Sequence, residues 1–311
     1  MEYRHLQAFV VLAEELHFGR AAQVLHIAQP ALSQYIKSLE NSLGMLLFQR
    51  DRRNVALTWE GGQLVEQARL AVSHYQRFQE HAVTLRKGFR GLIRLGYVGS
   101  SILEPGLMAV INRYRHHNPH IEIAIEEHNV DDQIRLLMDD QLDIALVRLP
   151  VPQSEELDYL DVATRPLVAV VPSTHPALIN RPLSLRSLEQ ETFMIQQDPP
   201  GVGLGWSALA ACHRAGFTPQ KIQHTRDVSV AVGLVAMGMG VTLVPQTQCS
   251  VMTPNVAYCP LEDTQATTTL TLCWQKRRCQ NTLKHFVQSA REQVLKEKQA
   301  EKSCPSGQQG E

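Results

Sequence analysis

Five residues near the start of the chain, Gln29, Pro30, Ser33, Gln34 and Lys37, bring amide, hydroxyl and ammonium groups together at spacings of one and three residues. If this segment is helical, the spacing places these groups on one face of its N-terminal half. Amide and hydroxyl groups hydrogen-bond base edges, and an ammonium group binds phosphate, so such a face suits the major groove of DNA. The alternative is an ordinary solvated helix face, and the neighbouring elements must decide between the two.

The apolar residues around this face predict a helix-turn-helix. They recur at three- and four-residue steps in two segments: Phe18, Ala21, Ala22 and Leu25, and then Leu32, Ile36, Leu39 and Leu43. Pro30 suits the first turn of the second helix, and Gly44 suits the position just past its end. A third amphipathic segment, residues 6–13, can close a three-helix core over Ala21 and Ala22.

Two short apolar runs within residues 47–57 predict a hairpin, or wing, directly after the second helix. Three arginines make its tip basic: Arg50, Arg52 and Arg53. A helix-turn-helix followed by a basic wing is a sharper signal than either part alone. Residues 1–58 are therefore predicted to form a winged helix-turn-helix DNA-binding domain.

A long helix is expected to start near Trp59, because Thr58 is a good N-cap and Glu60 places negative charge in the first turn. Its apolar positions repeat every 3.5 residues: Leu64, Ala68, Ala71, Tyr75, Phe78, Ala82 and Leu85. Such a seam favours pairing with a second copy of the chain, with packing against its own chain as the alternative. Residues 59–88 are predicted to be a dimerising linker helix that ends at Gly88, so that two recognition helices address two half-sites.

From Leu92 onward, short apolar strands alternate with amphipathic helices, which predicts a mostly parallel sheet covered by helices. Strands are expected near residues 92–97, 121–126, 142–147, 167–171, 193–196, 222–224, 241–244 and 268–274, with helices near residues 103–116, 131–139, 205–215, 228–237 and 281–297. Two crossings, near residues 160–166 and 261–267, would divide residues 89–297 into lobe I (91–163 and 268–297) and lobe II (164–267), with a cleft between them. The polar residues 298–311 are expected to be a disordered tail.

Composition restricts the classes of function. The 311 residues are 44% hydrophobic and 20% charged with a net charge of −1, yet residues 1–90 carry eleven Lys and Arg against eight Asp and Glu. No apolar run approaches a membrane span and no apolar leader opens the chain, so a cytoplasmic protein with no membrane partner is expected. The six cysteines show neither C-x-x-C pairs nor finger spacing, which predicts reduced structural thiols and no metal site; a redox-sensing cysteine is the alternative.

Several motifs together resemble the LysR-type transcriptional regulators. Those of the N-terminal part are Leu6-Gln7-Ala8-Phe9, Phe18-Gly19-Arg20-Ala21-Ala22, Gln29-Pro30-Ala31-Leu32-Ser33, Leu39-Glu40 to Gly44, Leu47-Phe48-Gln49-Arg50 and Leu57-Thr58 to Gly61; later segments are Leu142-Asp143-Ile144-Ala145, Gly233-Leu234-Val235-Ala236 to Gly240-Val241, and Leu243-Val244-Pro245. The resemblance covers residues 2 to about 290. It implies a multidomain α/β protein with a winged helix-turn-helix, a linker helix and a two-lobed effector domain like periplasmic binding proteins. It also implies homodimers paired into homotetramers, promoter DNA, a small-molecule effector and RNA polymerase as partners.

The resemblance also assigns roles to individual residues. DNA contacts would fall on Gln29, Pro30, Ser33, Gln34 and Lys37 in the groove and on Arg50, Arg52 and Arg53 at the wing. Effector contacts would fall on Gly99, Ser100, Ser101, Val130, Arg148, Gly203 and Leu204. Hydroxyls and backbone N–H groups at helix N-termini form an anion site to which Arg148 could add a charge-assisted bond, so a small carboxylate effector is expected. A surface ion pair at the lobe edge is the alternative role for Arg148, and carboxylate-binding family members often have a hydroxyl residue where this chain has Val130.

Two other classes of function compete with a ligand-responsive transcription factor. One is an α/β metabolic enzyme with an appended DNA-binding module, but residues 91–297 contain no catalytic constellation, so no catalytic residue and no cofactor is expected. The other is a general nucleoid-binding protein, for which the acidic remainder of the chain has the wrong sign of charge. A turnover assay would test the first class, and a comparison of specific with random DNA would test the second.

Overall fold

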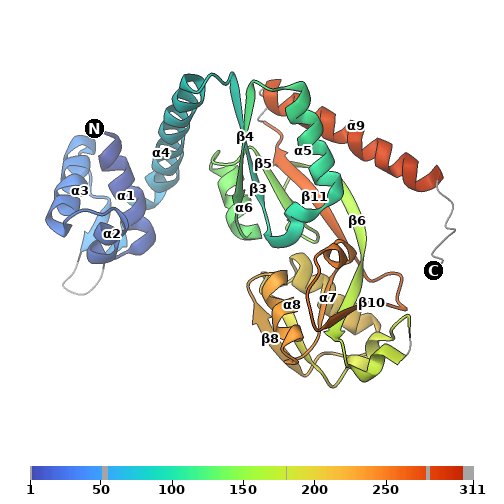
Figure 1. Cartoon of the computed structure of the whole chain (residues 1–311). Coiled ribbons are helices and arrows are strands. Elements are labelled where there is room, and N and C mark those ends of the chain that lie inside the picture. The colour runs from blue at the N-terminus through green and yellow to red at the C-terminus, as the bar shows by residue number, and fades with distance from the viewer. Residues whose placement is uncertain (1, 51–54, 180, 278–280, 304–311) are drawn as a thin grey trace. The chain divides into compact units, whose positions relative to one another are not determined.

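The computed structural model describes residues 2–50, 55–179, 181–277 and 281–303, and Figure 1 shows their helices and strands. The chain divides into two compact units. The first comprises Met1–Gly88 and Asp139–Gln141, and the second comprises Phe89–Met138 and Leu142–Glu311. Each unit buries apolar cores of its own.

The described part of the first unit consists of helices and one antiparallel hairpin: α1 (Tyr3–Glu15), α2 (Phe18–Val24), α3 (Gln29–Leu43), β1 (Phe48–Arg50), β2 (Val55–Leu57) and α4 (Trp59–Arg86). The predicted three-helix core is confirmed, because Ala21 and Ala22 are buried beneath Phe9 and Leu12 of α1 and Leu32 of α3. The predicted start and end of α3 are also confirmed. Pro30 lies in the first turn of α3, and Gly44 ends this helix in the left-handed conformation with φ 70°.

The start of α4 is held against the hairpin. The Thr58 hydroxyl accepts a hydrogen bond from the Gly61 N–H (2.9 Å) and donates one to the Leu46 carbonyl (2.8 Å). A Cβ on Gly61 would lie 2.2 Å from the Leu47 carbonyl oxygen. Only glycine therefore allows α4 to approach the hairpin this closely.

Lobe I of the second unit is a sheet covered by helices. Its strands are β3 (Gly91–Tyr97), β4 (Ile121–Glu127), β5 (Ile144–Arg148) and β11 (Thr267–Gln275), together with the first part of the long strand β6, which as a whole spans Leu157–Pro172. The strand order is β6-β11-β5-β3-β4. Its helices are α5 (Pro105–His117), α6 (Val130–Met138) and α9 (Asn281–Ser303), with a 3-10 turn η1 (Gly99–Leu103) after β3. The helix α9 continues past the predicted end at Glu297.

Lobe II contains β7 (Thr192–Gln196), β8 (Lys221–Thr225), β9 (Thr242–Pro245), β10 (Val256–Pro260), α7 (Gly203–Arg214), α8 (Val228–Ala236) and the 3-10 turns η2 (Pro176–Ile179), η3 (Leu185–Leu188) and η4 (Gln246–Ser250). The strands β9 and β10 pair with the second part of β6, and β7 pairs with β8. The strand β10 was not predicted. Among its residues only Cys259 is fully buried, so its sequence lacks a clear apolar alternation.

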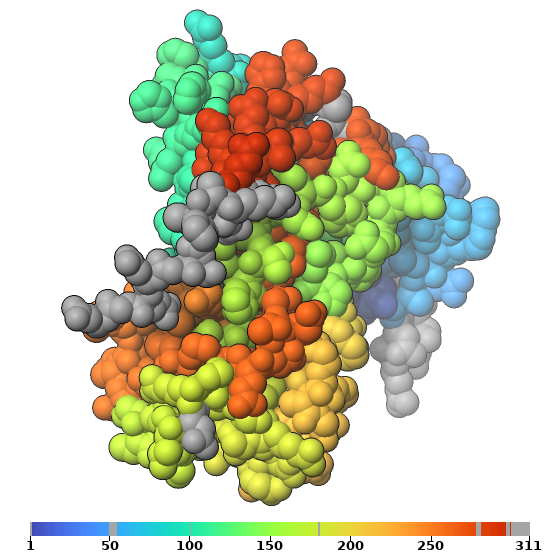
Figure 2. Space-filling model, turned by 90° about the vertical axis from the view of Figure 1, so that its right-hand side faces the viewer, coloured from blue at the N-terminus to red at the C-terminus, as the bar shows by residue number. Residues whose placement is uncertain are grey.

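The long strand β6 joins the two lobes. It pairs with β11 over Leu157–Pro166 and with β9 and β10 beyond that point. Figure 2 shows the side chains of lobe I (green and red) gathered into one mass and those of lobe II (yellow to orange) into another.

The prediction of a mostly parallel sheet holds for β3, β4 and β5 but not for β11, so the sheet is mixed. The strand β3 is parallel to β4 and β5, but β11 is antiparallel to both β5 and β6. The physical reason is connectivity, because β11 enters lobe I from the lobe II side after the chain has passed through β10. It fills the position between β5 and β6 in the direction opposite to β5.

Candidate functional site

The outer face of α3 presents the polar residues predicted for DNA. Those exposed are Gln29, Pro30, Gln34 and Lys37. Ser33 is half-buried beside them. The opposite face is fully buried through Leu32, Ile36 and Leu39. The helix is thus fixed by its apolar stripe, and its polar face is free to enter a groove.

The N-terminus of α3 is open. Its N-cap residue Ala28 makes no side-chain cap, and the first turn contains no acidic residue. Pro30 has no N–H, and the Ala31 and Leu32 N–H groups donate to the Ala28 carbonyl (2.9 and 3.2 Å), so this end attracts an anion mainly through the partial positive charge of the helix dipole. This end of α3 therefore suits a phosphate group.

Two positioning residues of the first unit escaped the sequence analysis. The buried Glu40 carboxylate, near the end of α3, accepts hydrogen bonds from the N–H groups of Leu47 (3.0 Å) and Phe48 (3.3 Å). Glu40 therefore fixes the hairpin relative to α3. His17 caps α2 by accepting a hydrogen bond from the Arg20 N–H through Nδ1 (3.2 Å).

The predicted wing is present, with β1 and β2 paired from Phe48 opposite Leu57 to Arg50 opposite Val55. The predicted contacts Arg52 and Arg53 lie outside the described residues, as does the side chain of Arg50. Their proposed role at the wing stays a prediction.

The seam of α4 is divided between two environments. Its first half packs into the core of the first unit through Ala68, with Leu64 partly buried beside it. Tyr75 stacks on Tyr3 of α1 with ring centroids 4.1 Å apart. Farther along, Phe78 is 72% exposed and Leu85 is 52% exposed. The first half of the seam thus packs on its own chain, and the second half is left open.

A pocket in the second unit brings together four of the seven residues predicted for the effector. Its lining consists of Val98, Val130, Arg148, Gln196, Asp198, Gly203 and Leu204. Val130 and Arg148 belong to lobe I, whereas Gly203 and Leu204 begin α7 in lobe II. The tertiary structure therefore assembles one site from segments far apart in sequence.

Arg148 is the cation of this pocket. It ends β5, is only 4% exposed, and its Nη1 atom has no hydrogen-bond partner within the described chain. Burial lowers the pKa of Arg148 to about 10, while the negative charges of Glu104 and Asp198 oppose this shift. The guanidinium group remains charged at neutral pH and offers an unused donor, which disfavours the surface ion pair considered above.

Asp198 is a pocket residue that the sequence analysis missed. Its Oδ2 atom accepts a hydrogen bond from the Gly205 N–H (2.9 Å), and its carboxylate also accepts one from the Leu204 N–H. Burial raises the pKa of Asp198, and these two hydrogen bonds and the charge of Arg148 counteract the rise. The run Asp198-Pro199-Pro200-Gly201 shortly before α7 was a turn signal that could have pointed to a residue folding back onto the helix.

The 3-10 turn after β3 contains the remaining three predicted effector residues. Gly99 adopts φ 42°, and Ser101 is fully buried with its hydroxyl accepting a hydrogen bond from the Val98 N–H (3.2 Å). Ser101 therefore holds the turn that carries Val98 into the pocket. The backbone of Ser100 belongs to this turn, and its side chain lies outside the described parts of the chain.

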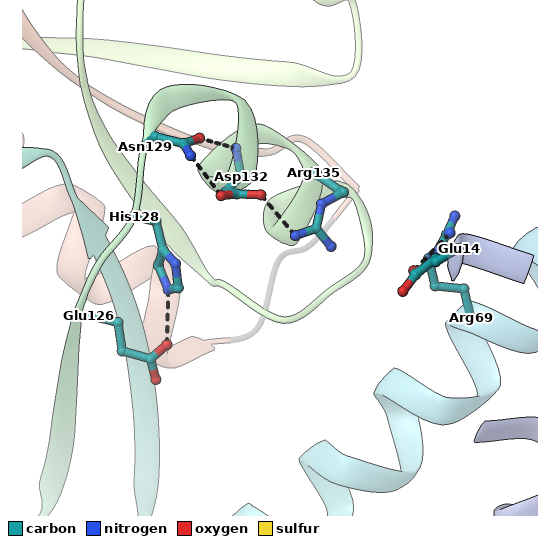
Figure 3. A network of polar contacts seen from close by, with 7 residues as sticks. All are labelled: Glu14, Arg69, Glu126, His128, Asn129, Asp132 and Arg135. Atoms are coloured by element: carbon teal, nitrogen blue, oxygen red, sulfur yellow. Dashed lines mark hydrogen bonds and ion pairs between the residues drawn. The ribbon is translucent and has the colours of Figure 1, made fainter. Parts of the chain in front are cut away.

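The start of α6, where Val130 lines the pocket, is paired internally (Figure 3). Asn129 accepts a hydrogen bond from the Asp132 N–H and donates one to the Asp132 carboxylate, both at 2.8 Å. Arg135 binds the same carboxylate (2.9 Å), and this hydrogen bond is the main cause of the lowered pKa of Asp132. Polar contacts at this helix start are thus made within the chain, and Val130 adds an apolar surface to the pocket.

Other chemistries find little support in the described residues. No group of three or more His, Cys, Asp or Glu among them could hold a metal ion. Burial raises the pKa of Cys212 and of Cys273 to about 12, so both thiols are protonated at neutral pH and poor nucleophiles. A search of the described helices for one long and apolar enough to cross a membrane finds none.

Comparison with protein families gives two matches. The model of the bacterial regulatory helix-turn-helix protein of the lysR family matches residues 3–62, and the model of the LysR substrate binding domain matches residues 86–295. Among curated proteins, the HTH-type transcriptional regulator AlsR of Bacillus subtilis is 30% identical over 301 residues, which cover 97% of this chain and 99% of AlsR.

Two solved structures have the same fold. Full-length CbnR complexed with its target DNA is similar with a TM-score of 0.70 at 21% identity, over 94% of this chain and 100% of that chain. The BenM effector binding domain with its effector benzoate is similar with a TM-score of 0.60 at 24% identity, over 72% of this chain and 99% of that chain. The first similarity spans both units, and the second corresponds to the unit that contains the Arg148 pocket.

Proposed function

The chain belongs to the LysR family of DNA-binding transcriptional regulators with an effector-binding domain, and we propose that a small carboxylate in the Arg148 pocket controls how it binds promoter DNA as a dimer of dimers. The alternative of a metabolic enzyme with an appended DNA-binding module is set aside, because the relatives are transcriptional regulators. RNA polymerase is the further partner that we propose, and the cytoplasm is the proposed location.

The first step of the proposal concerns DNA. The exposed side chains of α3 supply amides at Gln29 and Gln34 for base edges and an ammonium group at Lys37 for a phosphate. Ser33 is half-buried and would contact a base only where α3 lies deep in the groove. The open first turn of α3 supports the same orientation, with its N-terminus toward the DNA.

The second step concerns assembly. The exposed half of the α4 seam, with Phe78 and Leu85, presents apolar surface that a second α4 helix can cover. A dimer would hold two α3 helices at a spacing set by the two α4 helices, and pairing of dimers is what the family resemblance adds. Replacing Phe78 by Glu should give monomers in sedimentation velocity, whereas Ala82→Gln, on the same seam but with less apolar surface, should weaken the dimer less.

The third step concerns the effector, and one observation carries it. The buried Arg148 guanidinium has an Nη1 donor that no described group satisfies, and a carboxylate oxygen is the partner that its charge prefers. Val98, Val130 and Leu204 add apolar side chains to the pocket, and Gln196 and Asp198 add polar ones. The charge of Arg148 and the apolar side chains beside it favour a monocarboxylate, and benzoate bound to BenM is an aromatic example of that class.

The test uses the full chain and the DNA upstream of its own gene and of the neighbouring genes. Fluorescence anisotropy should show tighter binding to one of these fragments than to random DNA of the same length. A panel of small monocarboxylates should then shift this binding or raise the melting temperature, and Arg148→Gln should abolish the shift without loss of DNA binding. Equal affinity for all DNA would support a general nucleoid-binding protein and contradict the proposal.

A further inference from the structure

The first turn of α7 already has acceptors for its backbone N–H groups. The Val202 N–H donates to the Pro199 carbonyl (3.0 Å), and the Gly203 N–H donates to the Pro150 carbonyl (2.8 Å). The next two N–H groups, of Leu204 and Gly205, donate to the Asp198 carboxylate. An incoming carboxylate would therefore meet a helix N-terminus that a carboxylate of the chain already occupies.

The chain is shaped around the Asp198 carboxylate. A Cβ on Gly203 would lie 2.6 Å from Asp198 Oδ2 and 2.7 Å from its Cγ atom, and Gly203 adopts φ 73°. Both the missing side chain and the left-handed backbone at this position are thus required for the carboxylate to sit where it does. Asp198 fills a specific cradle.

The same pocket contains a cation that Asp198 leaves unsatisfied. Arg148 is buried, it lines the pocket together with Asp198, and its Nη1 donor has no partner in the described structure. The charge of Asp198 favours the charged form of Arg148, so the two groups interact electrostatically. The Asp198 carboxylate therefore offsets part of the Arg148 charge without using all of its donors.

We propose that Asp198 is a built-in substitute for the effector carboxylate, which it excludes from the α7 N-terminus until the effector displaces it and binds both α7 and Arg148. This inference rests on the proposed function, because it presumes a carboxylate effector in this pocket. It adds a regulatory device, since the protein supplies the competing anion itself.

The electrostatics make the two carboxylates exclusive. Two carboxylates at one site repel each other unless one takes up a proton or leaves. Asp131, whose negative charge also reaches Asp198, adds to this repulsion, while Arg148 is the positive group that acts on Asp198. An effector must therefore overcome Asp198 before it binds, which lowers its apparent affinity. Because Asp198 lies in lobe II and Arg148 in lobe I, the exchange also changes the attraction between the lobes.

The test removes the Asp198 carboxylate and offers a small free carboxylate in its place. In the full chain, Asp198→Ala vacates the cradle, and formate or acetate should bind there. Melting curves with sodium formate or sodium acetate, against sodium chloride at equal ionic strength, should show saturable stabilisation. The apparent affinity should be at least about tenfold higher than for the wild type, as expected when a charge-assisted hydrogen bond is no longer contested. Asp198→Ser replaces the carboxylate by an uncharged hydroxyl that can cap α7, and it gives the same measurement if the alanine variant is unstable.

A matched control is available in the same lobe. Asp227 caps α8 by accepting a hydrogen bond from the Val230 N–H (3.0 Å), so Asp227→Ala vacates a helix N-terminus outside the Arg148 pocket. It should gain no formate binding. The double variant Asp198→Ala with Arg148→Gln should lose the binding that Asp198→Ala gained.

Three results would overturn the inference: no gain in formate or acetate affinity for either Asp198 variant, an equal gain for Asp227→Ala, or a gain that survives Arg148→Gln. The promoter-binding assay on the wild type keeps the two proposals apart. Lost promoter specificity would reject the proposed function and leave the formate result standing. Intact promoter specificity without formate binding would reject only the role of Asp198.

Discussion

Two helices of this protein begin at surfaces proposed to bind anions, and their first turns differ. Helix α3 starts at Ala28 with no side-chain cap and no acidic residue in its first turn. Helix α7 starts beside the Asp198 carboxylate, which accepts hydrogen bonds from the Gly205 and Leu204 N–H groups. Both ends carry the same partial positive charge, because it arises from the backbone of any helix.

The difference matches the two kinds of ligand. DNA phosphates are permanent, numerous charges that approach from outside, so α3 can leave its N-terminus without a side-chain cap and without a competing carboxylate. A metabolite is absent part of the time, and the α7 turn lies beside a buried cation. An internal carboxylate keeps that turn and Arg148 partly neutralised when no effector is present. An open helix start thus suits a polyanion, and an occupied one suits a regulated ligand.

The strongest way to break the comparison is to disturb the α7 start. A Cβ on Gly205 would lie 2.4 Å from the Gln196 carbonyl oxygen, which is backbone and cannot turn aside. Gly205→Ala should therefore lower the free energy of unfolding of the second unit by about 3 kcal/mol. Urea denaturation measures this, and Gly233→Ala in α8, where a Cβ meets nothing within 4 Å, should not destabilise the protein. Equal stability of the two variants would contradict the packing described for α7.

The next prediction tests base readout by α3. Gln34→Ala removes an exposed amide from the groove-facing side and should cost about 2 kcal/mol of binding free energy on the cognate fragment. Binding to random DNA should hardly change, because the amide contacts a base and not a phosphate. Fluorescence anisotropy on both DNAs measures the two losses. Equal losses would refute base readout by Gln34.

A third change makes α3 resemble α7. Ala28→Asp supplies a cap at the N-terminus of α3, so it should raise the free energy of unfolding of the first unit by about 1 kcal/mol. The same carboxylate should repel DNA phosphates and weaken DNA binding. Ala28→Ser caps the helix without charge and should weaken binding less. If both variants bind DNA as tightly as the wild type, the α3 start does not face phosphate.

The smallest effect concerns the charge of Asp198. Burial raises its pKa above the ordinary value of 3.8, so the folded protein holds this proton more tightly than the unfolded chain does. The corresponding stability is present below that ordinary value and is lost as pH rises through the raised pKa. Asp198→Asn keeps an oxygen acceptor for α7 but does not titrate. The melting temperature of this variant should therefore rise relative to that of the wild type as pH increases from 3 to 7. A difference in melting temperature that does not change with pH would contradict the raised pKa.

Local pattern was enough for the first unit. The apolar steps of α3, Pro30 in its first turn and Gly44 after its end all act within a few residues, so periodicity and capping rules could predict this helix and its polar face. These rules could not predict the role of Glu40. Its carboxylate binds N–H groups that come after the helix has ended, and a single acidic residue in a helix usually faces solvent.

The second unit was predictable in its elements but not in their pairing. Alternating strands and helices indicated an α/β fold, yet the antiparallel entry of β11 between β5 and β6 depends on where the chain returns from lobe II. Likewise, Arg148 and Gly203 were selected by family resemblance, whereas Asp198 was recognised only from its hydrogen bonds to α7.

By itself, the sequence determined the helix-turn-helix, its polar face, the long linker helix and the alternation of strands and helices, because these depend on the spacing of residues that are close neighbours in the chain. Only the tertiary structure decided which half of the α4 seam is open, how β11 joins the sheet, and that Asp198 occupies the helix start beside Arg148. These features depend on burial and on contacts between residues distant in sequence, and no local spacing encodes them.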